Sequence, residues 1–582
     1  MSRVIFGFSG QPDCGWSMAL HQPSAVHVAY SLAEVLPLLN TVETAAASGA
    51  WVALLLSYEA APAFDTALQV NEPSAFPLAW AATFHQSSPL KDCTGSKSIN
   101  GERRDWKPHV TRAEYNNAIA RVRELIAGGH TYQVNYTFPL RSSFHGDPEA
   151  WYYSLCAAQN ALYPVYVDMG TLKVISLSPE LFFDRRGSRV HARPMKGTIK
   201  RGRWPAEDEA LAQSLAASSK DRAENVMIVD LIRNDLGKVA VPGQVNVSQL
   251  YEVERYPTLW QMTSTVEATL RPDVGLADLL AALFPCGSVT GAPKISTMRI
   301  IRDLEPFPRG IYTGAIGLIR PGGDCTFNVA IRTLLLDSAT GAVTFGVGGG
   351  VTIDSTADRE YDECLLKSSF LNAPQQPFRL LESILIEDSE FFLLELHLER
   401  LHDSARYFGF KHQRSEVLEE LERLRLEHSS GRWKVRLLLS KDGELMTEVV
   451  ELQAQDSQPL RVGLASEPIQ SNDRFLFHKT TNRTVYQQTL KARPDCDDVL
   501  LWNERGEITE STIANVVLAQ GKDLWTPALH SGLLPGVFRA ELLATRKIRE
   551  RVIHLEDLRQ AKSFFLINSV QKWRRAKLIS GP

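Results

Sequence analysis

The chain has 582 residues, of which 44% are hydrophobic and 22% charged, and its formal net charge is -4. This length predicts several domains, and the composition is typical of a soluble globular protein. The negative charge argues against a nucleic-acid-binding protein, which normally carries a basic surplus. We find no signal peptide and no run of about 20 apolar residues, so we expect a cytoplasmic protein without a membrane span.

The seven cysteines stand singly along the chain. No two of them have the spacing of a CxxC pair, so the sequence indicates neither a zinc site nor a disulfide framework. Their odd number fits a reducing compartment. Cysteine usage therefore agrees with the expected location in the cytoplasm.

Residues 1–105 alternate apolar segments with loops and form a first predicted subdomain. Residues 52–60 predict a buried strand, and the polar residues 88–102 predict a loop or a joint. A helix then begins at Thr111, because Glu114 follows three residues later in a capping-box pattern. Its apolar residues repeat at helical spacing until a pair of glycines, and residues 130–138 alternate like a strand.

Residues 178–202 predict a β-hairpin. Residues 181–184 and 190–192 are β-prone, and the stretch between them has the polar, glycine-containing composition of a turn. Glu180 and Lys196 lie just outside the two strands, so a hairpin would bring both side chains to one pocket. The simpler alternative is a surface hairpin whose charges are solvated.

Further along, residues 221–236 predict a helix that carries Glu224, and a glycine-rich turn at 287–294 leads into another helix. Strand-like segments follow at 312–319, 327–336 and 343–351, and a helix is expected at 357–370. In that helix Glu360, Glu363 and Lys367 share one face. A glycine-rich run at 346–351 precedes this helix, and its backbone amides, which no side chains cover, can approach a ligand. Residues 372–378 read as a linker before a second unit at 379–582.

Several motifs of the first half occur in a fixed order. They lie at residues 133–135, 178–182, 194–202, 223–235, 287–294, 309–317, 330–333 and 346–367. Together they resemble the chorismate-utilising enzymes, which include anthranilate, isochorismate and aminodeoxychorismate synthases. The resemblance implies large antiparallel β-sheets flanked by helices, with the chorismate-binding catalytic domain at residues 106–371.

The resemblance also implies roles for single residues. Glu180 would be the general acid and Lys196 the covalent nucleophile. Mg2+ would be held by the carboxylates of Glu224, Glu360 and Glu363. The substrate-binding residues would be Tyr312, Arg332, Gly348, Gly349, Gly350 and Lys367, where the cations and the glycine amides hold the substrate carboxylates.

The residue type at position 196 differs between members of that family. Anthranilate synthases tend to have alanine at this position, whereas the members that form aminodeoxychorismate have lysine. The amine could attack chorismate at C2 and expel the C4 hydroxyl, and ammonia would then displace it at C4. Many relatives have histidine where this chain has Gln261, and in anthranilate synthases that histidine is linked to pyruvate loss. A glutamine there favours a product that keeps its enolpyruvyl group.

The second half resembles the class IV pyridoxal-phosphate enzymes, namely branched-chain and D-amino acid aminotransferases and aminodeoxychorismate lyase. The similarity rests on residues 397–405, 477–483, 507–517 and 533–539, with Val517 where an aromatic residue is usual. It implies a fold type IV domain of two α/β subdomains. The implied cofactor-binding residues are Arg400, Lys479, Glu510, Ser511, Thr512, Asn515, Gly536, Val537 and Ser569. Lys479 would hold the cofactor and move protons, and Glu510 would pair with its pyridine nitrogen.

The two resemblances together predict an α+β and α/β multidomain enzyme that makes 4-aminobenzoate from chorismate in two steps. We find no glutaminase motif, so we expect ammonia from a separate glutamine amidotransferase subunit. Class IV enzymes commonly pair, which predicts a homodimer through the pyridoxal-phosphate domain. The alternatives are an anthranilate synthase-like half joined to an aminotransferase, and a sensor that binds chorismate or pyridoxal phosphate without turnover.

Overall fold

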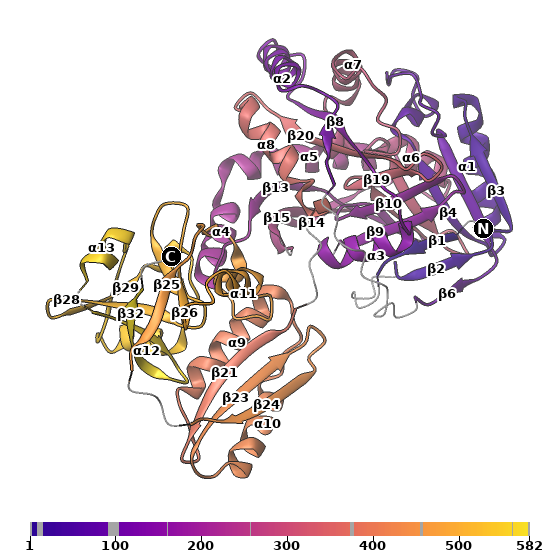
Figure 1. Cartoon of the computed structure of the whole chain (residues 1–582). Coiled ribbons are helices and arrows are strands. Elements are labelled where there is room, and N and C mark those ends of the chain that lie inside the picture. Colours follow the sequence, from indigo (N-terminus) through magenta and orange to yellow (C-terminus); the bar gives the residue numbers. More distant parts are fainter. Residues whose placement is uncertain are drawn as a thin grey trace. The chain divides into compact units, whose positions relative to one another are not determined.

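The computed structural model describes residues 3–8, 16–90, 104–159, 161–256, 258–372, 378–453, 458–561 and 563–579. The chain divides into two compact units, residues 1–200 with 212–375 and residues 201–211 with 376–582 (Figure 1). Residues 373–377 of the predicted linker and 91–103 of the predicted polar joint lie outside the described residues. Each unit is described by itself.

The first unit contains two ten-stranded sheets. The first sheet runs β16 (Gly291–Ala292), β8 (Gln133–Ser143), β20 (Ala342–Val351), β19 (Thr333–Asp337), β10 (Leu172–Ser178), β9 (Tyr163–Asp168), β1 (Arg3–Phe6), β2 (Met18–His21) and β6 (Ser87–Ser88), with β7 (Lys107–Pro108) beside β8. The second runs β13 (Met195–Lys200), β15 (Leu259–Leu270), β12 (Arg189–Arg193), β11 (Leu181–Arg186), β18 (Cys325–Val329), β17 (Ala315–Ile319), β4 (Trp51–Leu56), β5 (Ala79–Phe84) and β3 (Ala25–Ala29), with β14 (Ala240–Arg255) beside β15.

Helices cover the outer face of each sheet, and the two sheets pack against each other. The helices of this unit are α1 (Leu32–Ala47), α2 (Arg112–Ala127), α3 (Pro148–Gln159), α5 (Ser219–Gly237), α6 (Leu276–Leu283), α7 (Lys294–Leu304) and α8 (Ala357–Leu366), with short 3-10 turns at Tyr58–Ala63, Gly287–Val289 and Ser369–Asn372. Buried residues of α1, α5 and α6 join one core with the second sheet, and those of α2, α3 and α7 join another with the first sheet.

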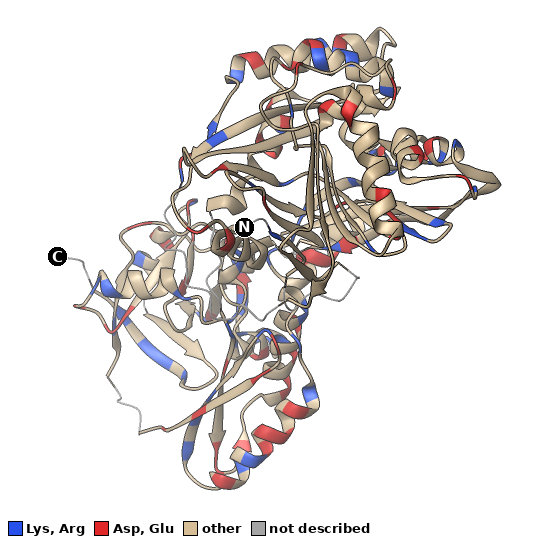
Figure 2. Ribbon diagram, turned by 90° about the vertical axis from the view of Figure 1, so that its right-hand side faces the viewer, with Lys and Arg blue, Asp and Glu red and all other residues tan. Residues whose placement is uncertain are grey.

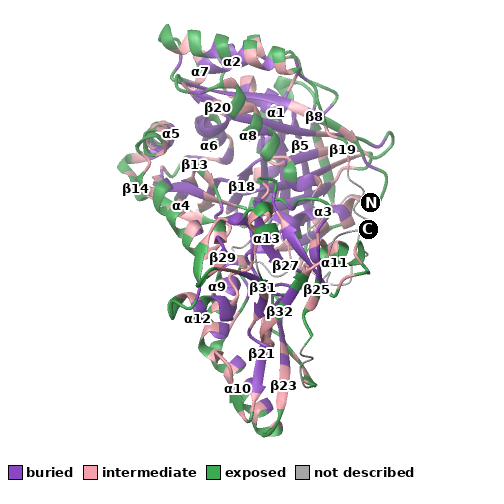
Figure 3. Ribbon diagram, turned by 60° about the vertical axis from the view of Figure 1, so that its left-hand side comes forward, coloured by how far each residue is buried: buried purple, intermediate pink, exposed green. Residues whose placement is uncertain are grey.

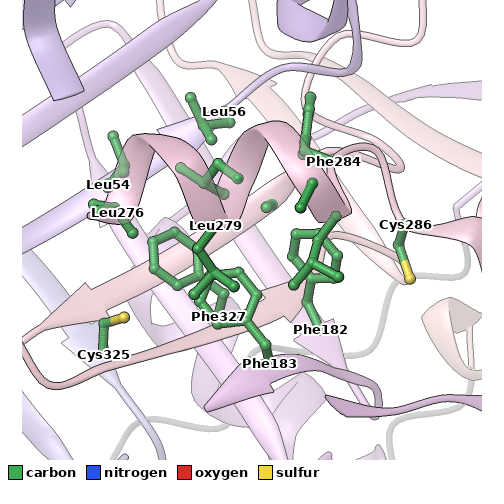
Figure 4. Packing of buried hydrophobic residues seen from close by; sticks show 14 of the residues in the cluster. Leu54, Leu56, Phe182, Phe183, Leu276, Leu279, Phe284, Cys286, Cys325 and Phe327 are labelled. Atoms are coloured by element: carbon green, nitrogen blue, oxygen red, sulfur yellow. The ribbon is translucent and has the colours of Figure 1, made fainter. Parts of the chain in front are cut away.

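The alternation of side chains along single strands explains these layers. On β4, Leu54 and Leu56 belong to the core under the helices, whereas Leu55 belongs to the core between the sheets. Neighbouring strand residues point to opposite faces, so a strand that is apolar throughout contributes to both cores. Figure 4 shows α6 above the second sheet, with Leu279 directed toward Phe183 and Phe327. Figure 3 shows these strands buried and the outer faces of the helices exposed.

Several predicted elements are confirmed. Helix α2 begins after Thr111, whose hydroxyl accepts a hydrogen bond from the Glu114 amide while the Glu114 carboxylate accepts one from the Thr111 amide. Helices α5 and α7 cover the predicted segments, whereas α8 ends at Leu366, before the predicted end at 370. The hairpin is also confirmed, because β11 and β12 pair antiparallel around a turn in which Gly187 has a φ of +55°.

Four predicted strands have different bounds, and one of them, expected at 312–319, begins only at Ala315. The strand expected at 52–60 ends at Leu56, where a 3-10 turn begins at Tyr58, and the strand expected at 130–138 begins only at Gln133. The strand expected at 327–336 is two strands, β18 and β19, of different sheets. Arg332 between them has a φ of +50°, a left-handed conformation that the apolar pattern of the sequence does not signal.

The second unit contains a four-stranded sheet and an eight-stranded sheet. The smaller sheet runs β22 (Glu390–Phe391), β21 (Leu380–Glu387), β23 (Arg432–Leu439) and β24 (Leu445–Glu451). The larger runs β27 (Ile508–Ser511), β26 (Asp498–Trp502), β25 (Leu460–Leu464), β32 (Lys572–Leu578), β31 (Ser563–Asn568), β28 (Asn515–Gln520), β29 (Asp523–Pro527) and β30 (Arg549–Arg551). Its helices are α9 (Leu394–Phe408), α10 (Arg414–Glu427), α11 (Thr484–Lys491), α12 (Val537–Ala544) and α13 (Leu555–Gln560), with 3-10 turns at Arg474–Leu476 and Leu529–Ser531.

Residues 201–211, which include the start of α4 (Pro205–Ala217), group with the second unit rather than with the catalytic domain predicted at 106–371. Arg201 makes an ion pair with Asp208, with 2.6 Å between Nη2 and Oδ2, and lies over the ring of Tyr407. The Tyr407 hydroxyl donates to the carbonyl of Gly202. This segment is therefore built into the core of the second unit.

Charged residues are distributed over the surface with both signs interspersed along the helices (Figure 2). Among the described residues, none of the helices is long and apolar enough to cross a membrane. The five cysteines of the described part of the chain, Cys156, Cys286, Cys325, Cys364 and Cys496, are free thiols.

Candidate functional sites

Glu180 lies in the short connection where the chain passes from β10 in the first sheet to β11 in the second. Its carboxylate is buried and accepts a hydrogen bond of 2.7 Å from the hydroxyl of Ser288. Burial raises the pKa of Glu180 to about 7, although the Ser288 bond and the charge of Lys196 oppose this rise. A carboxyl group with such a pKa can donate a proton near neutral pH.

Lys196 lies on β13 at a bulge, where the pairing with β15 shifts register and Gly197 has a φ of +92°. Burial lowers the pKa of Lys196, and the charges of Glu224 and Glu180 counter part of this change. The Asn225 Nδ2 donates a hydrogen bond of 3.3 Å to the Lys196 carbonyl. The Oδ1 of the same amide accepts a hydrogen bond of 2.5 Å from the Ser264 hydroxyl. A lysine whose ammonium is desolvated in this way is a stronger nucleophile at neutral pH.

Three successive glycines of β20 meet side chains of the site. The Gly348 carbonyl accepts a bond of 2.8 Å from the Lys367 ammonium. A Cβ at Gly349 would lie 3.1 Å from an oxygen of Glu360, and a Cβ at Gly350 would lie 2.6 Å from the Lys196 Nζ. The predicted glycine run is thus the surface on which Lys196, Glu360 and Lys367 converge, and a Cβ at Gly350 would displace the ends of the Lys196 and Gln133 side chains.

The three carboxylates predicted for the metal do not form a tight cluster: the charges of Glu224 and Glu363 act on Lys196, and the charge of Glu360 acts on Glu224. Burial raises the pKa of Glu224 and of Glu360, and the charge of Glu360 raises the pKa of Glu224 further. Glu363 pairs with Lys367 at 2.9 Å, and this ammonium holds the pKa of Glu363 below its usual range. Across the described residues, no three metal-binding side chains are gathered at a spacing that could hold an ion.

Two further side chains of this site were missed as functional residues by sequence reasoning. Ser288 lies in a 3-10 turn and is the hydrogen-bond donor to Glu180. Gln133 is buried, and a Cβ at Gly350 would lie 2.1 Å from its Nε2. Neither polar atom of its amide has a partner among the described residues. Both residues lie within the motifs that carry the family resemblance, but nothing in their residue types alone indicated a role.

Tyr312 and Arg332 are less directly connected to this group. The Tyr312 ring packs on Gly346, because a Cβ there would lie 2.2 Å from its Cγ. The Arg332 guanidinium donates to the Gln159 side chain at 2.7 Å, and burial lowers its pKa to about 10. The Arg332 carbonyl accepts from the amide of Leu177, three residues before Glu180. Within the described residues, no contact joins the Arg332 side chain to Lys196 or to the glycine run.

Gln261 stands where many relatives have histidine. Both the nitrogen and the oxygen of its side-chain amide make hydrogen bonds. Its Nε2 donates to the Gly197 carbonyl at 2.8 Å, and its Oε1 accepts from the Thr198 hydroxyl at 2.9 Å. These bonds fix the strand immediately after Lys196. A glutamine amide does not exchange protons near neutral pH, so Gln261 positions the backbone of β13 and supplies no acid or base.

A buried ion pair ties the elements of the site together. Arg309 binds both carboxylate oxygens of Glu305, with 2.8 Å from Nε and 2.7 Å from Nη2. The same guanidinium donates to the carbonyls of Asn135 and Val289 at 2.7 and 2.9 Å. Asn135 lies two residues after Gln133, and Val289 directly follows Ser288. The buried arginine therefore fixes two segments that contribute to the site.

A second site lies wholly within the second unit, in a cavity of about 380 Å³. All the cofactor-binding residues predicted for this half line it, namely Arg400, Lys479, Glu510, Ser511, Thr512, Asn515, Gly536, Val537 and Ser569. A Cβ at Gly536, where α12 begins, would lie 2.0 Å from the Asn515 Oδ1, so a larger residue there would displace the Asn515 side chain. Asn568 lines the same cavity.

Lys479 follows the 3-10 turn at Arg474–Leu476, and its carbonyl accepts from the amide of Leu381 on β21. Burial and the nearby Arg400 charge lower the pKa of Lys479 to about 7. Burial raises the pKa of Glu510 to about 7, although its carboxylate accepts bonds from the Tyr486 hydroxyl at 2.7 Å and the Leu534 amide at 3.1 Å. The cavity therefore holds an amine that is about half uncharged at neutral pH and a fixed carboxyl group.

Arg400 is held in place by Glu382, which accepts two bonds of 2.9 and 2.7 Å from its guanidinium. His397 lies 2.7 Å from the same carboxylate. Although burial favours the protonated acid, Arg400 and His397 lower the pKa of Glu382 to about 2. A further guanidinium nitrogen donates to the Pro535 carbonyl, just before α12. Arg400 thus points a fixed charge toward the start of that helix, where backbone amides can bind an anion.

Comparison with known sequences agrees with this arrangement. The sequence profile of the family described as chorismate binding enzyme matches residues 17–373. The chain belongs to the chorismate binding enzymes. A second profile, amino-transferase class IV, matches residues 379–579 of this chorismate binding enzyme. The class IV match implies pyridoxal phosphate as the cofactor of the second cavity, where Lys479 and Glu510 have the residue types that this group needs.

Two curated relatives of this chorismate binding enzyme are named as two different enzymes. It is 39% identical over 285 residues to aminodeoxychorismate synthase component 1 of Escherichia coli K12, covering 49% of the chain and 61% of that relative. It is 37% identical over 268 residues to anthranilate synthase component 1 of Aquifex aeolicus, covering 46% of the chain and 54% of that relative. The matched part therefore spans less than two thirds of either relative.

A solved structure shows the same fold for the first unit. Anthranilate synthase component I from Streptococcus pneumoniae TIGR4 superposes with a TM-score of 0.54 at 24% identity, covering 61% of this chain and 91% of that one. At this identity the similarity defines the fold of the chorismate binding enzyme, which agrees with the fold implied by its motifs. The function must therefore be inferred from the geometry of the two sites.

Proposed function

We propose that the first unit aminates chorismate to 4-amino-4-deoxychorismate and that the second removes pyruvate to give 4-aminobenzoate. The observation that carries the first step is the pairing of Lys196 and Glu180. Burial lowers the pKa of the Lys196 amine and raises the pKa of the Glu180 acid, and both shifts favour the neutral amine and the protonated acid that this step needs. The name of the Escherichia coli relative supports the same step.

In this proposal Lys196 attacks chorismate at C2, and the C4 hydroxyl leaves as water with a proton from Glu180. Ammonia then attacks C4 and expels the lysine, which regenerates the amine. Lys367, fixed on the Gly348 carbonyl and beside Glu363, would balance a substrate carboxylate. Arg332, Tyr312 and the glycine amides remain proposed binding groups. Arg332 must release Gln159 if it is to bind substrate with its full guanidinium.

We also propose Mg2+ as the ion of the first site. Glu224 and Glu360 are oxygen donors from different helices, and the charge of one raises the pKa of the other. A divalent cation would relieve this repulsion, so the two side chains fit the ion, with Glu363 close by. The ion would offset the charge of the substrate carboxylates.

In the second site the cofactor, when bound, supplies an electron sink for the bond that is broken. Lys479 is placed to hold the cofactor and to take the proton from C4 of the substrate. Glu510 would accept a hydrogen bond from the pyridine nitrogen, and Arg400 with the amides at the start of α12 would bind the phosphate. Loss of pyruvate leaves an aromatic ring, which makes the step strongly favourable.

The partners follow from the chemistry and from the relatives. The designation component 1 of the Escherichia coli relative implies a second component there, and we propose a separate glutamine amidotransferase that supplies ammonia to this chain. A homodimer through residues 379–582 stays a prediction from the class IV resemblance.

The proposal is tested by incubating the purified full chain with chorismate, ammonium, Mg2+ and pyridoxal phosphate, and by separating the products. We expect 4-aminobenzoate and pyruvate. Omission of pyridoxal phosphate should leave 4-amino-4-deoxychorismate as the end product. Formation of anthranilate instead would reject the proposed first step.

The second candidate function joins ortho amination of chorismate to amino transfer. It is favoured by the Aquifex aeolicus relative, whose identity is close to that of the Escherichia coli one. The lysine at position 196 and the bonded amide of Gln261 argue against it. An assay with an amino acid and a 2-oxo acid measures amino transfer directly, and rapid exchange without 4-aminobenzoate would support this second candidate.

The pH dependence of amination offers a prediction for Glu180. Because its pKa is about 7 and the acid form is required, the rate should fall as pH rises above about 7. In Ser288→Ala the carboxylate loses a hydrogen bond that stabilises its charged form, so the pKa rises. We expect the falling limb to move to higher pH by about one unit.

The measurement is the rate of amination at saturating chorismate from pH 5.5 to 9. Ser296→Ala is the matched control, because its hydroxyl binds the His130 carbonyl on the exposed surface of α7. The control should keep the wild-type profile. An unmoved limb in Ser288→Ala would show that Glu180 is not the group that titrates.

A further inference from the structure

The cavity of the second unit is lined by more cations than a cofactor phosphate requires. Arg400, Lys434, Arg436, Lys479 and Arg483 face it, whereas Glu510 is the one acidic residue among the described lining residues. Arg400 is neutralised by Glu382 and Lys479 is proposed to hold the cofactor. Lys434, Arg436 and Arg483 therefore have no role in the chemistry assigned so far.

Lys434 and Arg436 reach the cavity because of their positions on β23. Residues two apart on a strand point to the same face, and the intervening Val435 packs into the core with Leu437. Arg436 pairs in register with Ser383 of β21, which also lines the cavity. The two cations are thus presented side by side on the face of the small sheet that borders the cavity.

These cations approach the cavity on a different side from Arg400. Glu382, which holds Arg400, precedes Ser383 on β21, so the two side chains point to opposite faces of the sheet. Arg400 extends toward the start of α12 from the Glu382 face. Lys434 and Arg436 lie on the Ser383 face, so they can bind a second anion while Arg400 binds the first.

The charges on this face are available to a ligand. Within the described residues, the Lys434 ammonium makes no ion pair and no hydrogen bond, although its side chain is half-buried. Arg436 donates to Glu448 at 3.0 Å, but that pair is open to solvent, with side-chain exposures of 42% and 54%. An exposed ion pair contributes little free energy, so a carboxylate can replace or share it at small cost.

We propose that Lys434 and Arg436 form a carboxylate-binding subsite that selects amino substrates with a second carboxylate. The substrate class rests on the proposed function, since 4-amino-4-deoxychorismate carries one carboxylate on its ring and another on its enolpyruvyl group. A monocarboxylate amino acid would leave the subsite empty. The subsite therefore directs the class IV cavity toward the ring substrate and away from general amino transfer.

The test compares isophthalate, which has two carboxylates, with benzoate, which has one. Binding to the full chain loaded with pyridoxal phosphate is followed by the absorbance of the bound cofactor, which reports on this cavity and not on the first unit. We expect the wild type to bind isophthalate about tenfold more tightly than benzoate, as one additional charge-assisted contact would give.

The variants Lys434→Met and Arg436→Met should each lose most of this preference, and the double variant should bind the two probes equally. Lys441→Met is the matched control, because this exposed lysine follows β23 and lies outside the cavity lining. It should keep the wild-type ratio. Equal cofactor content in all variants shows that the cavity remains folded.

Retention of the isophthalate preference in the double variant would overturn the proposal. So would weaker binding of pyridoxal phosphate with the preference unchanged, because the cations would then serve the phosphate. The result is independent of the product assay. A chain that makes no 4-aminobenzoate but shows the expected ratios would refute the proposed function and leave the subsite in place.

Discussion

Lys196→Ala should reduce amination of chorismate by at least about 10³-fold, equivalent to roughly 4 kcal/mol of activation free energy. The amine is the proposed nucleophile, it is half-buried, and the charges of Glu224 and Glu180 act on it. Its Nζ lies against the glycine run, 2.6 Å from a Cβ built at Gly350. Ammonia alone would then have to attack a chorismate that has not been activated.

The measurement is 4-aminobenzoate formed from chorismate and ammonium, with 4-amino-4-deoxychorismate supplied in a parallel assay. The variant should convert the supplied intermediate at the wild-type rate, because Lys479 lies in the other unit. Lys200→Ala is the control, since this residue ends the same strand and is exposed. Undiminished amination in Lys196→Ala would exclude covalent catalysis by this lysine. If the variant formed anthranilate instead, Lys196 would still be the residue that directs the position of attack.

Lys479→Ala should give the reciprocal result, with loss of 4-aminobenzoate formation by at least about 10³-fold and accumulation of 4-amino-4-deoxychorismate. The pKa of Lys479 is lowered to about 7 by burial and by Arg400, so the wild-type amine can both bind the cofactor and carry a proton. Alanine can do neither. The first unit retains all of its proposed catalytic residues, so chorismate consumption should continue.

Chorismate, the intermediate and the product are quantified together by chromatography over the course of the reaction. Lys491→Ala serves as the control, because this exposed lysine ends α11 of the same unit. It should form 4-aminobenzoate at the wild-type rate. If Lys479→Ala still made 4-aminobenzoate without a lag, the second unit would not catalyse the elimination.

The structure also shows how far sequence patterns determine local elements. The capping box of Thr111 and Glu114 and the turn of the β11–β12 hairpin depend on neighbouring residues, so both could be predicted. The strand-like segment expected at 327–336 was not predicted to be interrupted. Arg332 takes a left-handed conformation there because the chain changes from one sheet to the other, which is a tertiary requirement.

The same distinction holds for the sites. The order of the motifs identified Glu180, Lys196, the glycine run and Lys479, because a family resemblance records which residues recur. It did not indicate that Ser288 binds Glu180, that Gln133 lies against Gly350, or that Arg332 binds Gln159. These contacts join residues that are far apart in the chain, and their distances depend on how the sheets are packed.

The sequence by itself therefore determined the two families, the residue types of both sites and most of the helices, because these depend on local pattern and on recurring motifs. The tertiary structure alone decided the reactivity of those residues. Burial shifts the pKa of Glu180 and of Lys196 in opposite directions, and both shifts arise from desolvation by segments distant in the chain. The hairpin sequence contains the carboxylate and the amine, but the surrounding sheets and helices shift their pKa values toward the forms that the proposed acid and nucleophile need.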